Sequence, residues 1–492
     1  MRRAGSPECL SLLVLLGLLP AFAGDGPAAK DVDEKASVEF LRHGETRACR
    51  LDCGSARKSP DWLAHGAMYQ IQLRAFTPEG TLKAATAKLA HLKSLGVTSI
   101  YLWPPTVADD DPDRSGWSPR QVKSGFDNPR NPYRVKDFWH VDPEYGTDDD
   151  LKAFVAEAHR LGLHVLLDVV YVHCGPNNPI VREHPEFFRF KDGKMEKTRW
   201  NFPLISMERQ ESRQYFIGNM AYWMKEFGMD GFRCDSSDEL PISFWEEARA
   251  ELEGIRPDVV LLAEGRRREN LRKAFDCSYD WEVSQWGIRE ALRGAVRAKE
   301  LRYQHGVSQD GLPAGGLTLH FTANHDLVND EYENRPEKTL GHDNQAAGLF
   351  LTFLLDGVPL LYTGQEICDA SRHSLYGRTG VDWSLLATPA ARERMALIRR
   401  LTALRRDNRA IACAPTVWMD NDRPDEVVSF ERCDAEAGRV VALANLSSGP
   451  VRVNVSGLKA GSLRPLVQAR ASVEGGTFLL GPWGFFAGTD RD

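Results

Sequence analysis

A unit of one strand followed by one helix recurs along most of the chain and restricts the fold more than any other feature. Short apolar runs are followed by segments in which apolar residues recur at helical spacing. In the first unit, residues 67–73 predict a strand and residues 82–92 predict a helix that ends at Gly96. The same order returns until about residue 406, so the pattern indicates an α/β fold.

Eight strands are predicted in this way, and each is apolar enough to be buried on both faces. They cover residues 67–73, 98–103, 164–170, 231–235, 259–264, 278–282, 317–323 and 359–363. Buried strands that alternate with helices are typical of a parallel (β/α)8 barrel. An open, doubly wound sheet is the alternative that the same alternation allows.

Breaks in the repeat predict the domain organisation. The barrel is expected over residues 61–406, after an unpatterned leader over 24–60. A long connection after the third strand predicts a small inserted subdomain over 174–210. Short strands separated by turns then predict a C-terminal antiparallel β-sandwich over 407–492.

Residues 1–23 are typical of a secretory signal peptide. Arg2 and Arg3 precede a short apolar run over 10–19, and Ala21-Phe-Ala23 provides a cleavage site. No segment has the ~20 consecutive apolar residues of a membrane span. We therefore expect a soluble protein that is secreted or periplasmic. Disulfides are permitted there, although buried free thiols are favoured for the cysteines within predicted strands.

Charge and cysteine spacing exclude several function classes. The net charge is −7 and no basic stripe occurs, which argues against a nucleic-acid partner. No Cys/His spacing resembles a zinc site, and no other motif requires a cofactor. No pattern indicates an oligomeric state.

Acidic residues end three of the predicted strands. Asp235, Glu264 and Asp326 should therefore meet on the rim where barrel enzymes carry their chemistry. A single acid in such a place could equally cap a helix or end a solvated loop. Three together suit glycoside cleavage, which needs a carboxylate and a protonated carboxylic acid. Arg233, on the same strand face as Asp235, should lower the pKa of Asp235, whereas an apolar pocket should keep Glu264 protonated.

Six motifs occur in a recognisable order, and four of them end predicted strands. This order resembles the α-amylase family of glycoside hydrolases, with some features of neopullulanases and cyclomaltodextrinases, from about residue 61 onward. The motifs are DPEYGT (142–147), DVVYVH (168–173), GFRCD (231–235), LLAE (261–264), FTANHD (321–326) and GVPLLYTGQE (357–366).

The resemblance implies a role for each acid. Asp235 would be the nucleophile, Glu264 the general acid/base and Asp326 the stabiliser of the transition state. The other residues that it assigns are four that contact the sugar or the nucleophile (Tyr133, His173, Arg233 and His325) and one that braces Arg233 (Asp168).

Four residues in three segments depart from the family pattern. Val172 replaces an asparagine that often binds a structural calcium, and an apolar side chain cannot ligate a hard cation. Asp238 and Glu239 replace the Lys-His pair of many α-amylases, and Arg266 replaces a common aromatic residue. These changes should affect substrate subsites and not the three acids.

The resemblance implies an α-glucan or oligosaccharide as the substrate. Hydrolysis of α-glucosidic bonds in starch-derived oligosaccharides is the leading hypothesis. A transglycosylase, in which a sugar hydroxyl replaces water, would use the same site. A catalytically silent binding homologue is the alternative from another class, and it has no need to keep all three acids.

Overall fold

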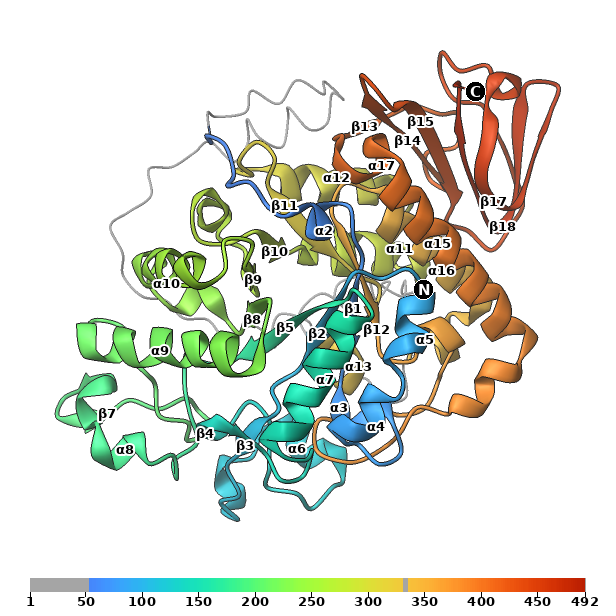
Figure 1. The fold of residues 1–492 in the computed structure, drawn as a ribbon. Helices are drawn as coiled ribbons and strands as arrows, with labels where there is room; N and C mark the ends of the chain where they lie inside the picture. Colours follow the sequence, from blue (N-terminus) through green and yellow to red (C-terminus); the bar gives the residue numbers. More distant parts are fainter. Residues whose placement is uncertain (1–52, 331–334, 492) are drawn as a thin grey trace, which may run out of the picture. The chain divides into compact units, whose positions relative to one another are not determined.

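The computed structural model describes residues 53–330 and 335–491, and it contains the predicted closed barrel (Figure 1). The predicted signal peptide, Cys49 and most of the predicted leader lie outside those residues. Around the barrel the parallel strands are β1 (Met68–Ile71), β2 (Ser99–Leu102), β5 (His164–Val169), β8 (Gly231–Cys234), β9 (Val260–Ala263), β10 (Cys277–Tyr279), β11 (Leu317–His320) and β12 (Val358–Tyr362).

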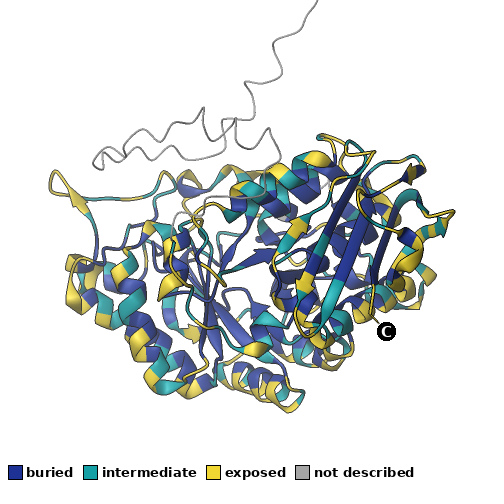
Figure 2. Ribbon diagram, turned by 90° about the horizontal axis from the view of Figure 1, so that it is seen from above, coloured by how far each residue is buried: buried dark blue, intermediate teal, exposed yellow. Residues whose placement is uncertain are grey.

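The barrel strands are buried on both faces, which explains why they are apolar almost throughout (Figure 2). One set of side chains fills the barrel interior, and it includes Met68, Leu166, Val260, Leu262 and Leu360. A larger set packs the strands against the surrounding helices. Strand register then decides which polar side chains meet at the carboxyl rim.

Helices cover the outside of the barrel. The longer ones are α7 (Asp148–Arg160), α9 (Gln210–Phe227), α10 (Ile242–Ile255), α12 (Lys299–Gln309), α15 (Gly341–Leu354) and α16 (Pro389–Asp407). Shorter ones are α2 (Asp61–Ala64), α3 (Leu73–Phe76), α4 (Leu82–Thr86), α5 (Leu89–Ser94), α11 (Glu290–Leu292), α13 (His325–Asp330), α14 (Pro336–Thr339) and α17 (Arg409–Cys413).

The chain after β10 differs from the sequence prediction. The strand predicted over 278–282 ends at Tyr279, and a π-helical segment follows over Glu282–Arg289. The Asp280 carboxylate accepts a hydrogen bond from the Val283 backbone N–H and so begins that segment. The helix predicted over 288–298 is wrong in extent, because Gly294 adopts φ +69° and a separate helix, α12, follows.

Two long connections rise from the carboxyl ends of β2 and β5. The first contains β3 (Thr106–Ala108), α6 (Pro119–Ser124) and β4 (Val135–Val141). The second contains α8 (Ile180–Glu183) and a small hairpin of β6 (Phe190–Lys191) and β7 (Lys194–Met195). This second connection corresponds to the predicted inserted subdomain, although the exact domain boundaries stay predictions.

The C-terminal part is an antiparallel sheet domain, as predicted. Hydrogen bonds run without interruption through six strands, because the long strand β18 pairs with β15 at one end and β16 at the other. The strands are β13 (Thr416–Trp418), β14 (Val427–Asp434), β15 (Gly438–Asn445), β16 (Val451–Val453), β17 (Arg464–Glu474) and β18 (Thr477–Thr489).

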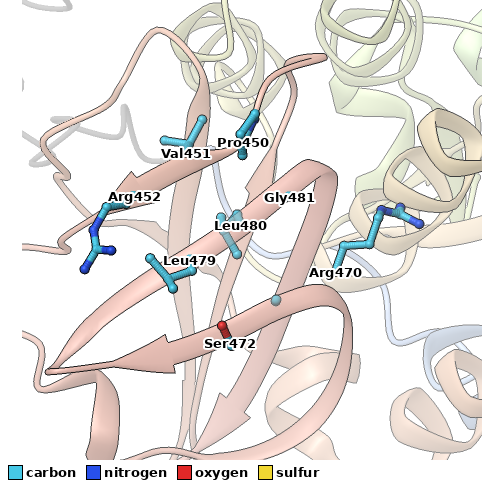
Figure 3. A pocket seen from close by; sticks show the side chains of 9 residues that line it. Pro450, Val451, Arg452, Arg470, Ser472, Leu479, Leu480 and Gly481 are labelled. Atoms are coloured by element: carbon cyan, nitrogen blue, oxygen red, sulfur yellow. The ribbon is translucent and has the colours of Figure 1, made fainter.

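The sheet domain packs on the barrel helix α15. The rings of Phe350 and Phe485 stack with centroids 4.6 Å apart, and both side chains are fully buried. A groove of about 500 Å³ lies on the sheet domain, and Leu479 and Leu480 are among its lining residues (Figure 3). Arg470 also lines this groove, and its guanidinium pairs with Asp343 of α15. The predicted catalytic acids take no part in the groove.

Two further expectations concern the described residues. None of their helices is long and apolar enough to cross a membrane. Their seven cysteines are all free thiols, and three of them are buried: Cys234 and Cys277 in barrel strands, and Cys174 in the connection after β5.

Candidate active site

A single guanidinium joins three carboxylates at the carboxyl rim of the barrel. Arg233 is fully buried, and its Nη1 donates to Asp168 Oδ1 and Asp235 Oδ1, each at 2.7 Å. Its Nη2 lies 2.8 Å from Glu264 Oε2. Strand register produces this cluster, because Asp168 of β5 lies beside Arg233 of β8. A buried cation needs such partners, so the cluster is stable only as a unit.

The turn after β8 holds the predicted acid Glu264 in place. Ser236 adopts a left-handed conformation with φ +42°, and its backbone N–H donates to Glu264 Oε2 at 2.8 Å. The Ser237 hydroxyl and backbone N–H both donate to the Glu264 carbonyl oxygen. The strained turn therefore aims Glu264 at Asp235. Neither serine was predicted from the sequence, because nothing in their spacing separates them from an ordinary turn.

The three acids differ in how readily they lose their protons. Burial raises the pKa of Glu264 to about 8, although Arg233 opposes that rise. Burial also raises the pKa of Asp235 to about 6. For Asp326 burial is outweighed by His325 and Arg120, and its pKa is lowered. At neutral pH Glu264 is therefore largely protonated while the two aspartates are largely ionised.

One expectation about Asp235 is wrong in direction. Arg233 does favour the ionised carboxylate, as the sequence suggested, but burial has the larger effect and the net pKa is raised. The conclusion that Asp235 is largely ionised at neutral pH still follows.

Asp168 lies where the resemblance puts it, against Arg233. Its second oxygen accepts hydrogen bonds from the hydroxyls of Tyr101 at 2.7 Å and Tyr133 at 2.9 Å. Because both of its carboxylate oxygens accept hydrogen bonds, Asp168 can hold Arg233 and Tyr133 in place but has no oxygen available for the reaction. Tyr101 was not predicted, because its strand position is that of an ordinary core residue.

His325 and Asp326 both face the site because the strand pattern has ended before them. Helix α13 begins at His325, and the Asn324 side chain accepts a hydrogen bond from the Asp326 backbone N–H at 3.0 Å. His325 lies 2.7 Å from both the Gln70 amide nitrogen and the Tyr133 hydroxyl. Burial lowers the pKa of His325 to about 4, so the ring is neutral at pH 7.

His173 is fixed by the residues around it. Its Nε2 lies 3.0 Å from the Tyr133 carbonyl oxygen, and its ring stacks on Phe202 at 5.0 Å. Burial lowers the pKa of His173 to about 4. A neutral ring whose Nε2 donates to that carbonyl can offer only its other nitrogen to a sugar.

Asp238 supports the site from behind and does not extend a subsite. Its carboxylate accepts hydrogen bonds from the backbone N–H groups of Arg266 at 2.6 Å and Arg267 at 3.0 Å. The carboxylate also packs so closely on Gly265 that a Cβ there would lie 2.4 Å from Asp238 Oδ1. The segment that carries Glu264 is therefore pinned to the turn after β8.

The residues around Val172 do not fit the structural calcium that many members of the α-amylase family bind at this position. Val172 is buried, and its carbonyl oxygen accepts a hydrogen bond from the Ile205 backbone N–H at 2.9 Å. Within residues 53–330 and 335–491, no group of three or more His, Cys, Asp or Glu side chains is arranged to hold a metal ion. We derive no step that uses a metal.

Comparisons with known proteins find similarity to enzymes of the α-amylase type. The family model described as "Alpha amylase, catalytic domain" matches residues 44–203. A malto-oligosyltrehalose trehalohydrolase of Deinococcus radiodurans is 29% identical over 372 residues, which are 66% of this chain and 57% of that protein. A cyclomaltodextrinase of Geobacillus thermopakistaniensis is 24% identical over 420 residues, which are 75% of this chain and 66% of that protein.

The solved structures show the same architecture. The crystal structure of a maltogenic α-amylase, AmyB, of Thermotoga neapolitana superposes with a TM-score of 0.73 at 23% identity. The alignment covers 87% of this chain and all of that one. The chain spans about three fifths of the length of the curated relatives that it matches first. These similarities lead to one conclusion: the chain resembles the α-amylase catalytic domain over residues 44–203, and its barrel has the fold of the solved α-amylases.

Proposed function

We propose that this protein is a retaining hydrolase of α-glucosidic bonds in starch- or maltodextrin-type oligosaccharides. The observation that carries the proposal is the pair Asp235 and Glu264 on one guanidinium, with the first largely ionised and the second largely protonated at neutral pH. Retaining enzymes hold these groups ~5–5.5 Å apart and inverting enzymes ~6.5–9.5 Å apart. Adjacent nitrogens of one guanidinium favour the shorter separation.

The mechanism has two displacements. A carboxylate oxygen of Asp235 attacks the anomeric carbon while Glu264 transfers its proton to the departing glycosidic oxygen, so the C–O bond breaks and a glycosyl ester forms. Glu264, now ionised, takes a proton from water as that water attacks the same carbon and releases Asp235. Asp326, whose charge is retained, stabilises the positive charge that develops on the ring.

A substitution of Glu264 tests the assignment of the acid. The variant Glu264→Gln should lose at least ~1,000-fold in kcat on maltotriose, because no proton reaches the leaving oxygen. With α-glucosyl fluoride, whose leaving group needs little protonation, the variant should still form the glycosyl ester, but water should release that ester slowly without Glu264 as the base. Added azide needs no such base and should restore turnover, producing a glucosyl azide. The matched control Glu251→Gln changes an exposed residue and should behave as the parent protein.

Two outcomes would reject the proposal. If Glu264→Gln cleaves maltotriose at the parental rate, Glu264 is not the acid. If Asp235→Asn still traps a covalent sugar ester, Asp235 is not the nucleophile. Products longer than the starting oligosaccharide would identify a transferase on the same site, and no turnover of any α-glucoside would favour a silent homologue.

A further inference from the structure

One sector of the barrel rim is covered by the chain that follows β2. We call residues 114–130 the cover segment; it contains α6. Its Ser118 hydroxyl lies 3.3 Å from the Tyr376 hydroxyl, and the Asn128 side-chain amide donates to the Tyr376 carbonyl oxygen at 3.0 Å. The Arg372 guanidinium donates to the Ser124 carbonyl oxygen. These contacts fasten the cover segment to the loop after β12.

The cover segment also fits closely on that loop and on the chain after β1. The Phe126 ring packs against Gly377 so tightly that a Cβ at Gly377 would lie 2.3 Å from ring atoms. Arg74, in the helix that follows β1, donates through Nη1 to the Arg130 carbonyl oxygen at 2.9 Å. The segment therefore lies against the connections that follow both β1 and β12.

Arg120 links the cover segment to Asp326. Its Nη1 donates to Asp326 Oδ1 at 3.2 Å, and each of the two side chains is 26% exposed. Arg120 belongs to the connection after β2, and Asp326 follows β11. Since β1 and β12 are the two strands between β2 and β11 around the barrel, this contact bridges their sector of the rim.

The position of the leaving group indicates which part of the substrate faces the rim beside β1 and β12. The leaving group must lie beside the acid Glu264, which follows β9. In the eight-strand ring β1 stands opposite β9. A glucan chain that continues beyond the reacting sugar, away from the leaving group, would therefore run toward β1 and β12 and meet Arg120 and the cover segment.

We propose that the cover segment closes the non-reducing side of the site, so that the enzyme removes single glucosyl units from the non-reducing end. Arg120 is the specificity-determining residue, because it occupies the side of Asp326 toward which the next sugar would extend. This inference rests on the proposed function and narrows its substrate to free chain ends.

The test compares two forms of maltopentaose, each labelled at its reducing end, and one of them blocked at the non-reducing end by a 4,6-ethylidene group. The free form should give labelled maltotetraose as its first product. The blocked form should be cleaved with a kcat/KM lower by at least about 100-fold, since a closed pocket cannot admit it. Equal cleavage of both forms would overturn the inference and leave the proposed function intact. Cleavage of neither would reject the proposed function itself.

A variant separates specificity from simple damage. Arg120→Ala should raise the kcat/KM ratio of blocked to free substrate by at least about 10-fold, because it removes the side chain that meets the second sugar. It should also move the acid limb of the pH profile upward, because Arg120 is a positive charge beside the coupled acids and its loss favours their protonated forms.

The control is Arg452→Ala, an exposed arginine on the sheet domain, which should change neither substrate's rate. Equal losses on both substrates for Arg120→Ala would indicate a merely structural role and overturn the assignment. Arg120→Lys keeps the positive charge on a shorter side chain. It should keep the acid limb of the pH profile near its parental position and give an intermediate kcat/KM ratio of blocked to free substrate.

Discussion

Arg233 contacts three buried acids at the carboxyl rim. The same guanidinium contacts Asp168, Asp235 and Glu264, and yet burial keeps the pKa of each carboxyl above its ordinary value. The proposed nucleophile Asp235 and the proposed acid Glu264 share this cation, but their pKa values differ by about two units, at about 6 and about 8. The difference gives a range of pH in which one is ionised and the other protonated.

We therefore expect a bell-shaped dependence of kcat/KM on pH. Activity should rise through about pH 6, as Asp235 loses its proton, and fall through about pH 8, as Glu264 loses its own. The two limbs belong to the coupled group of acids. Initial rates on maltotriose in buffers of constant ionic strength measure the profile, and undiminished activity at pH 10 would contradict the role of Glu264.

Removal of metal should leave the enzyme active. Neither the acid chemistry nor the apolar Val172 provides a reason for a bound cation. Incubation with EDTA followed by desalting should change kcat by less than about twofold. The same treatment should change the melting temperature by less than about 2 °C. A loss that added calcium restores would show that other oxygen ligands hold the ion.

At the scale of elements, the turns after β8 and β9 form one support. The carboxylate of Asp238 in the first turn accepts the backbone N–H groups of Arg266 and Arg267 in the second. Ser236 and Ser237 return hydrogen bonds to Glu264. The acid is thus positioned by backbone groups of two loops and not by its own strand alone.

The variant Asp238→Ala should lower kcat by about 10- to 100-fold with a smaller change in KM, because Glu264 loses its aim while the sugar site remains. Steady-state kinetics on maltotriose measure both constants. The exposed Asp258→Ala, beyond the end of α10, provides a matched control. A rise in KM with an unchanged kcat would mean that Asp238 contacts substrate instead.

Sequence periodicity predicted the strands but not the loop contacts. Each barrel strand was found within a few residues, because buried parallel strands are uniformly apolar. Strand ends also located Asp235 and Glu264. Gln70 and Arg120 were not predicted as site residues, and Asp238 was expected at a substrate subsite but supports the loop that carries Glu264. Their partners lie on other loops, and local spacing does not determine strand register or loop path.

At the scale of the whole molecule, the sheet domain stabilises the barrel through α15. The Phe350 and Phe485 rings stack within an apolar interface, and Arg432 of β14 donates to the Leu354 carbonyl oxygen at 2.7 Å. Arg470 adds an ion pair with Asp343. The last barrel helices therefore depend on a domain that lies outside the chemistry.

Truncation of Phe485 should destabilise the whole chain. Phe485→Ala removes a fully buried ring and should cost about 3–5 kcal/mol of the free energy of unfolding. Calorimetry should record a lower melting temperature for the transition that contains the barrel. The exposed Phe190→Ala serves as the control, and a barrel transition that stays unchanged would show that the two parts unfold independently.

The cluster around Arg233 also has a consequence for folding. Its partners come from β5, β8 and the end of β9, so the charges balance only when all three strands are in register. A shift by one residue on any of them would turn a carboxylate or the guanidinium toward the helices and leave a charge buried without its counterion. The groups proposed for catalysis therefore also destabilise barrels with wrong strand register, so the active site forms only in a correctly paired barrel.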